Sequence, residues 1–432
     1  MKQYKTAVIL LFLFLSFPLS AAIQGNRELA QLQEEVNQAI LDVQDAKASR
    51  WPTVELELSG TYMSRPPIGP ITVPAGVLGP NEILLYEGME STAYDLGLTL
   101  TQPLFTWGKI NASVHAQEAV ANAKQQKLRN REKELTAEIA TRAGTRSELE
   151  AIHQLLEQQY SLGDELVTLA SKAVASGLML ELERSEIELQ LQEIELALIE
   201  SEYSTREQTL ELNTLTKEQD LSVYDFQEDA IHTLLKKPID ALLEQALSSE
   251  RASIRALFAM KRATEETEKL AKGSFYGKPD LALVVSAGYS GSRFPFVEND
   301  WQEKDASDFT VSVGLKTTIF DGGKISNTIK RSQSQGRTAD MELQETRERI
   351  TKEVKENHLL LRSTMQKIQL EQKKQATMQQ RLSTNEALYQ SGYGSKQDVI
   401  QAQMNLLTSQ ITEHRLRIEA WTAYQKLWYL CE

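Results

Sequence analysis

Four short segments of this chain alternate strictly between apolar and polar positions. The apolar positions are Val54, Leu56, Leu58 and Tyr62; Tyr94, Leu96, Leu98 and Leu100; Leu281, Leu283, Val285, Ala287 and Tyr289; and Phe309, Val311, Val313 and Leu315. This period of two predicts β-strands, and strands of about ten residues with one apolar face are typical of a transmembrane β-barrel. A half-buried sheet in a soluble protein produces the same alternation, so a single strand leaves both interpretations open.

Between the strands the pattern predicts very long helices. No proline occurs in residues 104–237 or after residue 295, and both stretches are rich in Gln, Glu, Leu, Ala and Lys, which favour helix. Narrow apolar stripes such as Leu162, Leu166 and Leu169 are typical of coiled-coil packing. A helix of about 70 residues, which each stretch can hold, extends roughly 100 Å at about 1.5 Å per residue. Such a helix is too long for an ordinary globular core.

The strand, turn and helix pattern occurs twice. Residues 100–110 align with residues 315–325, an offset of 215, and the glycines that follow the two long helices, Gly177 and Gly392, keep the same offset. A constant register over that length predicts two equivalent units in one pseudo-symmetric structure. The predicted boundaries are about 26–216 for repeat one, 217–237 for a linker and 238–430 for repeat two. Within each repeat a second helix runs back from the glycine, to about Thr216 and about Tyr429.

The first 22 residues have the layout of a secretory signal peptide. Lys2 and Lys5 precede an apolar run at residues 7–17, and Ser20-Ala21-Ala22 supplies small residues for cleavage after Ala22. An uncleaved membrane anchor is the alternative, but the run is shorter than the roughly 20 residues that a spanning helix needs. We therefore expect residues 23–432 to form one exported protomer.

Charge and cysteine content narrow the function further. The formal net charge is −13, and loss of Lys2 and Lys5 with the signal peptide makes it −15. An acidic exported protein is a poor ligand for nucleic acid, because phosphates repel carboxylates, so that partner is excluded. The one cysteine, Cys431, is next to last, so disulfides play no part in the fold.

The four predicted strands are too few to close a barrel. An open sheet edge is not tolerated in lipid, so the chain must oligomerise. Two chains give eight strands, whose interior is filled by side chains, whereas three give twelve and leave a lumen. A ring is the natural assembly of identical chains. The long loops 65–91 and 293–308 join the strand pairs, and we expect them on the side of the membrane opposite the helices.

These features together resemble the TolC family of outer membrane efflux proteins. The resemblance rests on the duplicated strand-turn-helix units, the strand starts Trp51-Pro52 and Lys278-Pro279, and the hairpin glycines Gly177 and Gly392. It implies an α+β membrane protein in which three chains form a 12-stranded outer membrane β-barrel, four strands per chain, continued by a long periplasmic α-helical barrel. It also implies a homotrimer whose partners are a periplasmic adaptor (membrane fusion protein), an inner-membrane pump of the RND or ABC type and outer membrane lipid.

One departure from the family concerns the helix that leads into each repeat. The lead-in stretch 26–50 is shorter than its counterpart, 238–272. The family builds a belt around its tunnel from the mid-chain linker and the C-terminal tail, and we therefore expect this belt to be reduced. We expect the linker, residues 217–237, to contribute to it through Asp220, Tyr224 and Phe226.

The helix hairpins end in two glycine-containing tips, at residues 176–178 and 391–394. Glycine suits a tight reversal because it accepts positive φ, so a purely structural turn is one interpretation. The resemblance implies another, in which Gly177, Leu178, Gly392 and Tyr393 contact the hairpin tips of the adaptor.

An acid stands six positions beyond each tip glycine, Glu183 in the first repeat and Asp398 in the second. Solvated charge on a helix face is the ordinary explanation for both. The resemblance implies a periplasmic gate, in which Tyr389 and an acid hold the tunnel shut and a ring of acids from three chains selects cations. Asp398 matches one ring acid, but Gln401 stands at the second ring position. Three carboxylates in place of six predict a weaker attraction for cations.

No catalytic or metal-binding pattern is present in the sequence. The histidines lack the spacing of metal ligands; they are His115, His153, His232, His358 and His414. The segment 322–324 lacks the earlier glycine and the following Ser or Thr of a phosphate-binding loop. We predict a protein that is not an enzyme, with no cofactor or metal, and interpret Lys109 and Lys324 as residues at the membrane interface, with Trp107 and Tyr94 in an aromatic belt.

A passive exit duct of a tripartite efflux or type I secretion system is the function that these features favour. Small molecules or polypeptides would cross the outer membrane without chemistry, driven by the pump. A periplasmic adaptor is an alternative, but an adaptor has one helical hairpin where this chain has two. A structural coiled-coil envelope protein is a third reading, and the four amphipathic strands disfavour it. Drugs, metal ions and secreted polypeptides all remain open as cargo.

Overall fold

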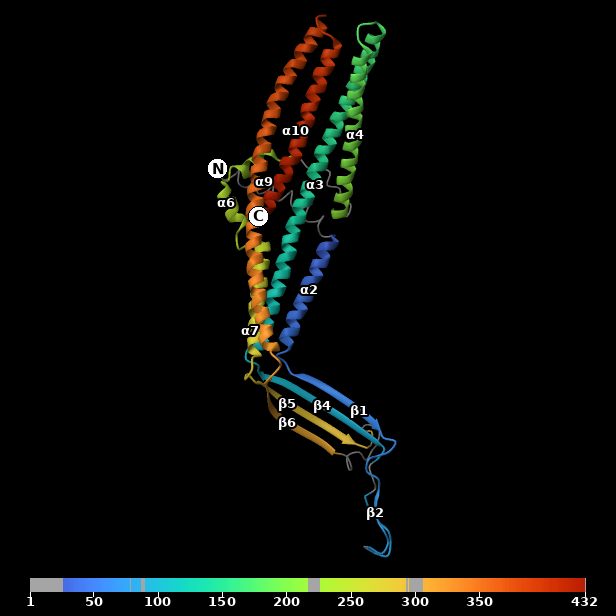
Figure 1. The fold of residues 1–432 in the computed structure, drawn as a ribbon, viewed down its shortest axis with the longest axis vertical. Helices are drawn as coiled ribbons and strands as arrows, with labels where there is room; N and C mark the ends of the chain where they lie inside the picture. Colours follow the sequence, from blue (N-terminus) through green and yellow to red (C-terminus); the bar gives the residue numbers. More distant parts are fainter. Residues whose placement is uncertain are drawn as a thin grey trace, which may run out of the picture. The chain divides into compact units, whose positions relative to one another are not determined.

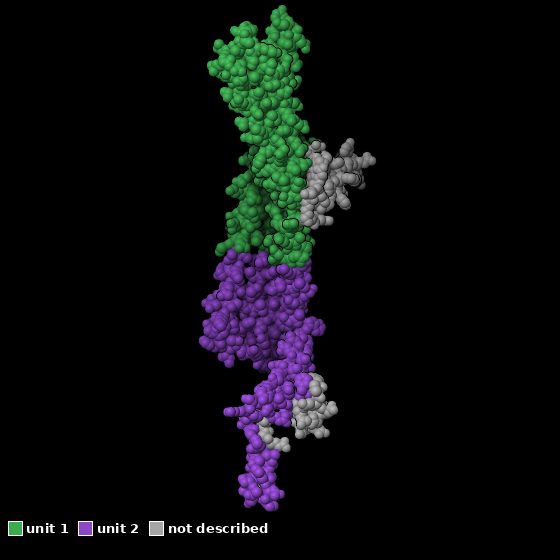
Figure 2. All heavy atoms as spheres, turned by 90° about the vertical axis from the view of Figure 1, so that its right-hand side faces the viewer, with its two compact units in different colours: residues 1–36, 122–258, 340–432 green, residues 37–121, 259–339 purple. Residues whose placement is uncertain are grey.

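The computed structural model describes residues 26–77, 79–86, 90–216, 226–292, 294 and 306–431. The predicted signal peptide and residues 217–225 of the predicted linker lie outside these ranges. Two compact units are present, and each draws residues from both halves of the chain (Figure 2). Unit 1 comprises residues 1–36, 122–258 and 340–432, and unit 2 comprises residues 37–121 and 259–339.

Long paired helices dominate the secondary structure (Figure 1). The helices are α2 (Arg27–Ala48), α3 (Lys109–Ala175), α4 (Glu181–Thr216), α5 (Glu228–Leu235), α6 (Ile239–Ala246), α7 (Ala252–Gly273), α9 (Lys324–Gln390) and α10 (Lys396–Cys431). The two long helices α3 and α9 have 67 residues each, and the returning helices α4 and α10 have 36 each. The predicted helices are therefore confirmed, with equal lengths in the two halves of the chain.

The four predicted strands form one antiparallel sheet in unit 2, in the order β1-β4-β5-β6. They are β1 (Thr53–Tyr62), β4 (Thr92–Phe105), β5 (Asp280–Gly291) and β6 (Ala306–Lys316). Leu56 faces Leu98, and Val285 faces Val311, so apolar residues meet across the ladders on one side of the sheet. The pairing of β4 with β5 joins the two halves of the chain in the sheet.

A second, two-stranded sheet occupies the segment that we expected to be a plain loop. It pairs β2 (Ile71–Val73) with β3 (Ile83–Tyr86). The expectation was wrong because the two strands have only three and four residues. Alternation of apolar and polar residues cannot be recognised over so short a stretch, and the nearby prolines favour a loop.

In unit 1 the helices lie in the order α9, α10, α3 and α4 (Figure 1). Ile400 and Met404 of α10 share a buried cluster with Leu156 of α3, while Ala402 of α10 packs with Leu382 of α9. Helix α4 contributes Ile194, Leu198 and other apolar residues to the cluster around α3; of these two, Ile194 is buried and Leu198 is half-buried. Helices α4 and α9 are therefore the two lateral edges of this layer.

A separate core of unit 1 surrounds Trp421 of α10. It buries Ile231 of α5 and Leu242 of α6 against α9 and α10. The Trp421 indole N–H donates to the Ala140 carbonyl at 2.9 Å, and the ring lies against Gly144 of α3. The short helices after the linker thus belong to a packed core.

The expected difference between the lead-in helices is wrong. Helices α2 and α7 both have 22 residues. The longer stretch before the second repeat is divided into α6 and α7, since residues 247–251 form turns in which the Ser248 hydroxyl accepts from the Glu250 N–H at 3.2 Å. Within the described residues, no helix combines the length and the apolar character that crossing a bilayer requires.

Candidate functional site

The first predicted tip is a tight glycine cap at the end of α3. Gly177 has a φ of 72°. Its N–H donates to the Val174 carbonyl at 2.9 Å, and the Leu178 N–H donates to the Ala173 carbonyl at 2.8 Å. These two bonds are those of the Schellman motif, which satisfies carbonyl groups that the helix end leaves unpaired.

The second tip repeats this geometry at the end of α9. Gly392 has a φ of 82°, and its N–H donates to the Tyr389 carbonyl at 3.0 Å. The Tyr393 N–H donates to the Leu388 carbonyl at 2.9 Å. The residue after each glycine projects into solvent, with Leu178 84% and Tyr393 87% exposed. Each tip therefore presents a large, exposed side chain on a hydrogen-bonded turn.

The two predicted gate acids cap the helices that follow the tips. Glu183 is the third residue of α4, and its carboxylate accepts from the Leu180 N–H at 3.0 Å. Asp398 is the third residue of α10 and forms a capping box with Ser395. The Ser395 hydroxyl donates to Asp398 Oδ2 at 2.6 Å and accepts from the Asp398 N–H at 3.1 Å.

The structure does not join the four predicted gate residues into one network within the described part of a single chain. The Asn385 side chain donates to the Asp398 carbonyl at 3.2 Å, so α9 and α10 are linked beside the tip. Gln401 donates to Asn405 at 3.4 Å, and Tyr389 is exposed. Asp398 and Gln401 lie on α10, Tyr389 on α9 and Glu183 on α4.

An ion pair ties the second tip to the first long helix. Lys396 of α10 pairs with Glu165 of α3. The hydrogen bond that the Lys396 ammonium donates to Glu165 raises the pKa of Lys396 above its ordinary value. Because both groups are well exposed to solvent, this pair fixes orientation more than it adds stability.

In unit 2, the first Gly-Lys turn clamps the start of β5. The Trp107 indole N–H donates to the Pro279 carbonyl at 2.9 Å, and Lys109 forms an ion pair with Asp280. Trp107 has a φ of 53°, which is uncommon for a residue other than glycine. Trp107 and Lys109, which we interpreted as interfacial residues, therefore also hold the turn to the neighbouring strand.

The second Gly-Lys turn is held by a carboxylate. Asp321 accepts from the N–H groups of Gly323 at 2.9 Å and Ile325 at 2.8 Å, and from the Tyr276 hydroxyl. The Tyr276 hydrogen bond, supported by these N–H groups, holds the pKa of Asp321 below its ordinary value, and the same bond raises the pKa of Tyr276. The two turns thus have the same place in the repeat but different chemistry.

The polar face of the sheet carries carboxylates. Asp95 accepts from the Ser290 hydroxyl at 2.7 Å and from the Ser59 hydroxyl at 3.3 Å, which ties β1, β4 and β5 together. Asp308 of β6 lies opposite Gly288 on the neighbouring strand. The alternation of the strands places these acids on the face opposite the apolar residues.

Helix α4 exposes a regular apolar stripe at one edge of the helical layer. Its members recur every seven residues and are between 60% and 69% exposed; they are Leu182, Leu189, Leu196, Tyr203 and Leu210. A seven-residue repeat of apolar residues is the seam of a coiled coil, which packs against another helix. Within the described single chain, the stripe faces solvent.

The second repeat shows what such a stripe contacts. Met404 and Ile411 of α10 lie 215 positions after Leu189 and Leu196 of α4, and they pack into the α3 cluster. The neighbouring Thr408 hydroxyl accepts from Gln159 of α3 at 2.8 Å. By the internal repeat, the stripe of α4 corresponds to the surface by which α10 contacts α3, and the repeat equivalent of α3 is α9.

The two edge helices carry opposite charge. Helix α4 contains ten Glu and two Arg. The stretch 352–381 of α9 contains seven Lys or Arg and three Glu. The counterparts of Thr408 and Gln159 in the other repeat are Glu193 and Lys374, an oppositely charged pair. The two exposed edges, α4 and α9, thus carry complementary charge.

Comparison with known proteins settles the family. A family model described as outer membrane efflux protein matches residues 19–216 and 242–430. The chain belongs to the outer membrane efflux protein family. This confirms the resemblance to the TolC-like efflux proteins and places the protein among the efflux channels of the outer membrane. No curated protein sequence matches the chain.

Solved structures show the same fold for this efflux protein. CusC is 17% identical, with a TM-score of 0.76 over 96% of this chain and 91% of that chain. VceC from Vibrio cholerae is 18% identical, with a TM-score of 0.74 over 96% and 95% of the two chains. The CmeC channel of Campylobacter jejuni is 15% identical, with a TM-score of 0.76 over 96% and 85%. The family and these neighbours are channels, which favours transport over catalysis.

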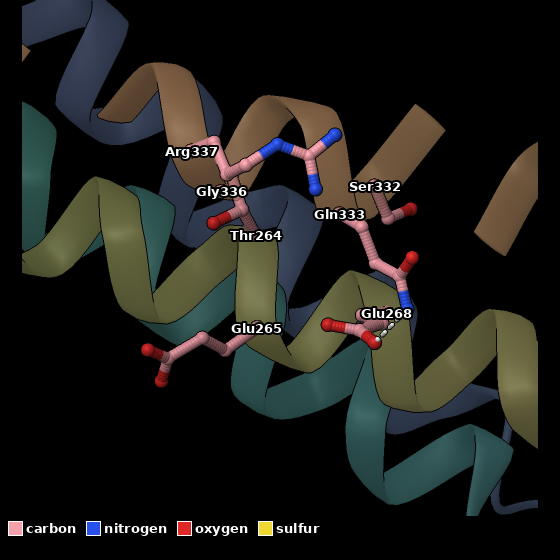
Figure 3. Close-up of a pocket in the computed structure, with 7 residues that line it drawn as sticks. All are labelled: Thr264, Glu265, Glu268, Ser332, Gln333, Gly336 and Arg337. Carbon is pink, nitrogen blue, oxygen red and sulfur yellow. Dashed lines mark hydrogen bonds between the residues drawn. The ribbon is translucent and has the colours of Figure 1, made fainter. Parts of the chain in front are cut away.

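A shallow groove of the efflux protein between α7 and α9 gives no sign of a binding site (Figure 3). Its walls are lined by Thr264, Glu265, Glu268, Ser332, Gln333, Gly336 and Arg337. Gln333 donates to Glu268 at 2.9 Å, and Lys272 pairs with the same carboxylate. Among the described residues, no group of three or more His, Cys, Asp or Glu side chains is placed to hold a metal.

Proposed function

We propose that three copies of this efflux protein form a passive exit duct of a tripartite efflux or type I secretion system. The sheets form a 12-stranded barrel in the outer membrane, and the long helices continue it as a barrel in the periplasm. An inner-membrane pump of the RND or ABC type and a periplasmic adaptor deliver small molecules or polypeptides. The observation that carries the proposal is that both the sheet and the helical layer of one chain have open edges.

The sheet is incomplete because β1 and β6 are edge strands. Their apolar faces are exposed, as shown by Leu56 on β1 and Val311 on β6. Lipid does not tolerate an open edge, so each edge must pair with another strand. The sheet is antiparallel throughout and has an even number of strands, so β1 of one copy can continue antiparallel from β6 of the next.

The helical layer is incomplete because its two edges expose complementary surfaces. Helix α4 presents the seven-residue apolar stripe and excess Glu, and α9 presents excess Lys and Arg. Leu359 and Leu370 are exposed on α9, at the positions equivalent to Gly144 and Leu155 of α3. Ring closure buries both edges in the same step as the sheet edges.

The tips and the capping acids take their roles from this assembly. Leu178 and Tyr393, held by the caps at Gly177 and Gly392, contact the adaptor. In a three-fold ring Asp398 occurs three times at the periplasmic end, and this ring of carboxylates attracts cations. Tyr389, Glu183 and Gln401 line the same end, so that opening changes contacts among neighbouring α4, α9 and α10 helices.

Fractionation and conductance test the proposal. The mature protein is expected in the outer membrane fraction, and the purified oligomer is expected to conduct ions in a planar bilayer without nucleotide. Recovery as a soluble periplasmic monomer, or a purified oligomer that never conducts, would exclude the duct. Co-purification with a transporter and an adaptor then identifies the system and its cargo.

A further inference from the structure

The hairpin β2–β3 is too exposed to be stable alone. It forms a sheet of two short strands, in which Ile71 of β2 and all four residues of β3, Ile83, Leu84, Leu85 and Tyr86, face solvent. Val77 near the turn is 68% exposed and Leu85 is 61% exposed. An isolated two-stranded hairpin is marginal in water, and contiguous exposed apolar surface marks an interaction site.

The composition of the hairpin limits what can cover it. Residues 66–86 contain one charged residue, Glu82, and no Lys or Arg. Phosphate-bearing lipid headgroups are bound by cationic side chains, so the outer surface of the membrane is a poor partner. A surface that is apolar and nearly uncharged suits another apolar protein surface.

The hairpin also has open strand edges that can receive a further strand. The sheet contains only β2 and β3, so each strand pairs along one edge and keeps the other edge unpaired. An unpaired edge is a template for pairing with another chain. The five prolines between residues 66 and 80 restrict the segment before it is covered, which lowers the entropy cost of ordering it.

Length allows the hairpins of three copies to meet. From Met63, just after β1, to Gly76 in the turn is 13 residues, or about 40 Å at full extension. Strands about 4.8 Å apart and tilted by about 40° give a twelve-stranded barrel a radius of roughly 12 Å. Each hairpin is therefore long enough to reach the three-fold axis from the barrel wall.

We propose that the β2–β3 hairpins of the three protomers pack against one another across the mouth of the barrel and form an apolar lid on the side away from the helices. The apolar surface of each hairpin is covered by the β2–β3 hairpins of the other two protomers. This rests on the proposed trimeric barrel. The duct then has two closures, the proposed periplasmic gate and this lid. Cargo must displace the lid before it leaves.

Disulfide trapping tests contact between the hairpins. The native thiol is removed first by Cys431→Ser; burial raises the pKa of that thiol to about 11, so it reacts poorly in any case. Val77→Cys in this background is expected to give disulfide-linked dimers within the trimer under mild oxidant. Tyr62→Cys, equally exposed but at the base of the loop, is the matched control and is expected to give none.

Conductance tests the closure itself. Val77→Lys with Leu85→Lys places like charges on all three hairpins, and the open-channel conductance is expected to rise several-fold. Ser64→Lys with Ser91→Lys adds the same two charges per chain at the exposed base of the loop, outside the lid and the barrel strands, and is expected to leave the conductance unchanged. If a conducting trimer forms but Val77→Cys does not cross-link and the lysine variant conducts like the parent, the lid is wrong and the duct stands. A monomer or dimer in native mass spectrometry overturns both.

The lipid surface is the competing partner. A fluorophore on Val77→Cys is expected to be insensitive to quenchers carried by the lipid. Strong quenching would place the hairpin in the bilayer and overturn the lid.

Discussion

At the scale of single residues, the two acids of the proposed gate combine an observed capping contact with a proposed part in cation selection. Asp398 completes a capping box with Ser395, and Glu183 caps the Leu180 N–H. These bonds need an acceptor oxygen but no charge, because Gln also serves in a capping box. A ring that selects cations needs the charge itself. Local structure explains the acceptor oxygens, and the helix dipole favours carboxylates in a first turn. The proposed trimer adds a second use for the charge, the attraction of cations.

Substitutions that remove charge but keep the acceptor separate the two roles. Asp398→Asn is expected to lower the preference for cations in bilayer reversal potentials while the melting temperature changes little. Asp398→Ala removes the cap as well and is expected to lower both. Glu183→Gln tests the first repeat in the same way. Unchanged selectivity in Asp398→Asn would remove Asp398 from the conduction path.

Helical glycines provide a test of packing at one residue. A Cβ at Gly144 of α3 would lie 2.4 Å from the Trp421 indole nitrogen, and Trp421 is a buried member of the unit 1 core. Gly144→Ala is expected to destabilise the protein by about 1–3 kcal/mol, the usual cost of overpacking. Gly336 of α9 has nothing nearer than 3.7 Å, so Gly336→Ala is expected to add stability, by up to about 1 kcal/mol, through helix propensity.

Thermal unfolding in detergent, followed by circular dichroism, measures this pair. The two substitutions make the same chemical change in helices of equal length. If both variants shift the melting temperature in the same direction, close packing of Trp421 on Gly144 is not what determines the effect.

At the scale of elements, alternation and proline placement predicted the strands and long helices closely. The predicted alternation at 54–62 became β1, and the helix expected to end near Thr216 ends there. These patterns are local, so one sequence suffices to recognise them. The capping box at Ser395 and Asp398 was missed, although its Ser-x-x-acid pattern was readable.

Other contacts could not be predicted because they join distant parts of the chain. Trp421 meets Ala140 across 281 positions, and Trp107 meets Pro279 across 172. Nothing in either local sequence specifies its partner. The α4 stripe was visible as a seven-residue repeat, but its significance appears only when the structure shows that α4 lies at an edge.

The edge helices make an electrostatic prediction. Glu193 of α4 and Lys374 of α9 occupy the positions at which Thr408 and Gln159 form a hydrogen bond within the chain. Lys374→Glu is expected to weaken the trimer by about 0.5 kcal/mol per contact, three times per ring, because like charges then face each other. Adding Glu193→Lys restores the attraction and is expected to recover the stability of the trimer.

The adjacent Lys373→Glu is the matched control for this swap. It makes the same charge change on another face of α9. We expect it to weaken the trimer less than Lys374→Glu does, and we expect Glu193→Lys not to restore the lost stability. Trimer dissociation with increasing denaturant, scored by native electrophoresis, measures all four proteins. Failure of the double variant to exceed Lys374→Glu would show that these edges do not meet.

At the scale of the whole molecule, the number of copies decides whether the protein can be a duct. Two chains supply eight strands, and side chains fill a barrel of that size. Three chains supply twelve strands and leave a lumen, so the proposed function requires a trimer. Native mass spectrometry in detergent is expected to give three chain masses, with a single population. A dimer that conducts would contradict the argument from strand number, and a dimer that does not conduct would contradict the duct.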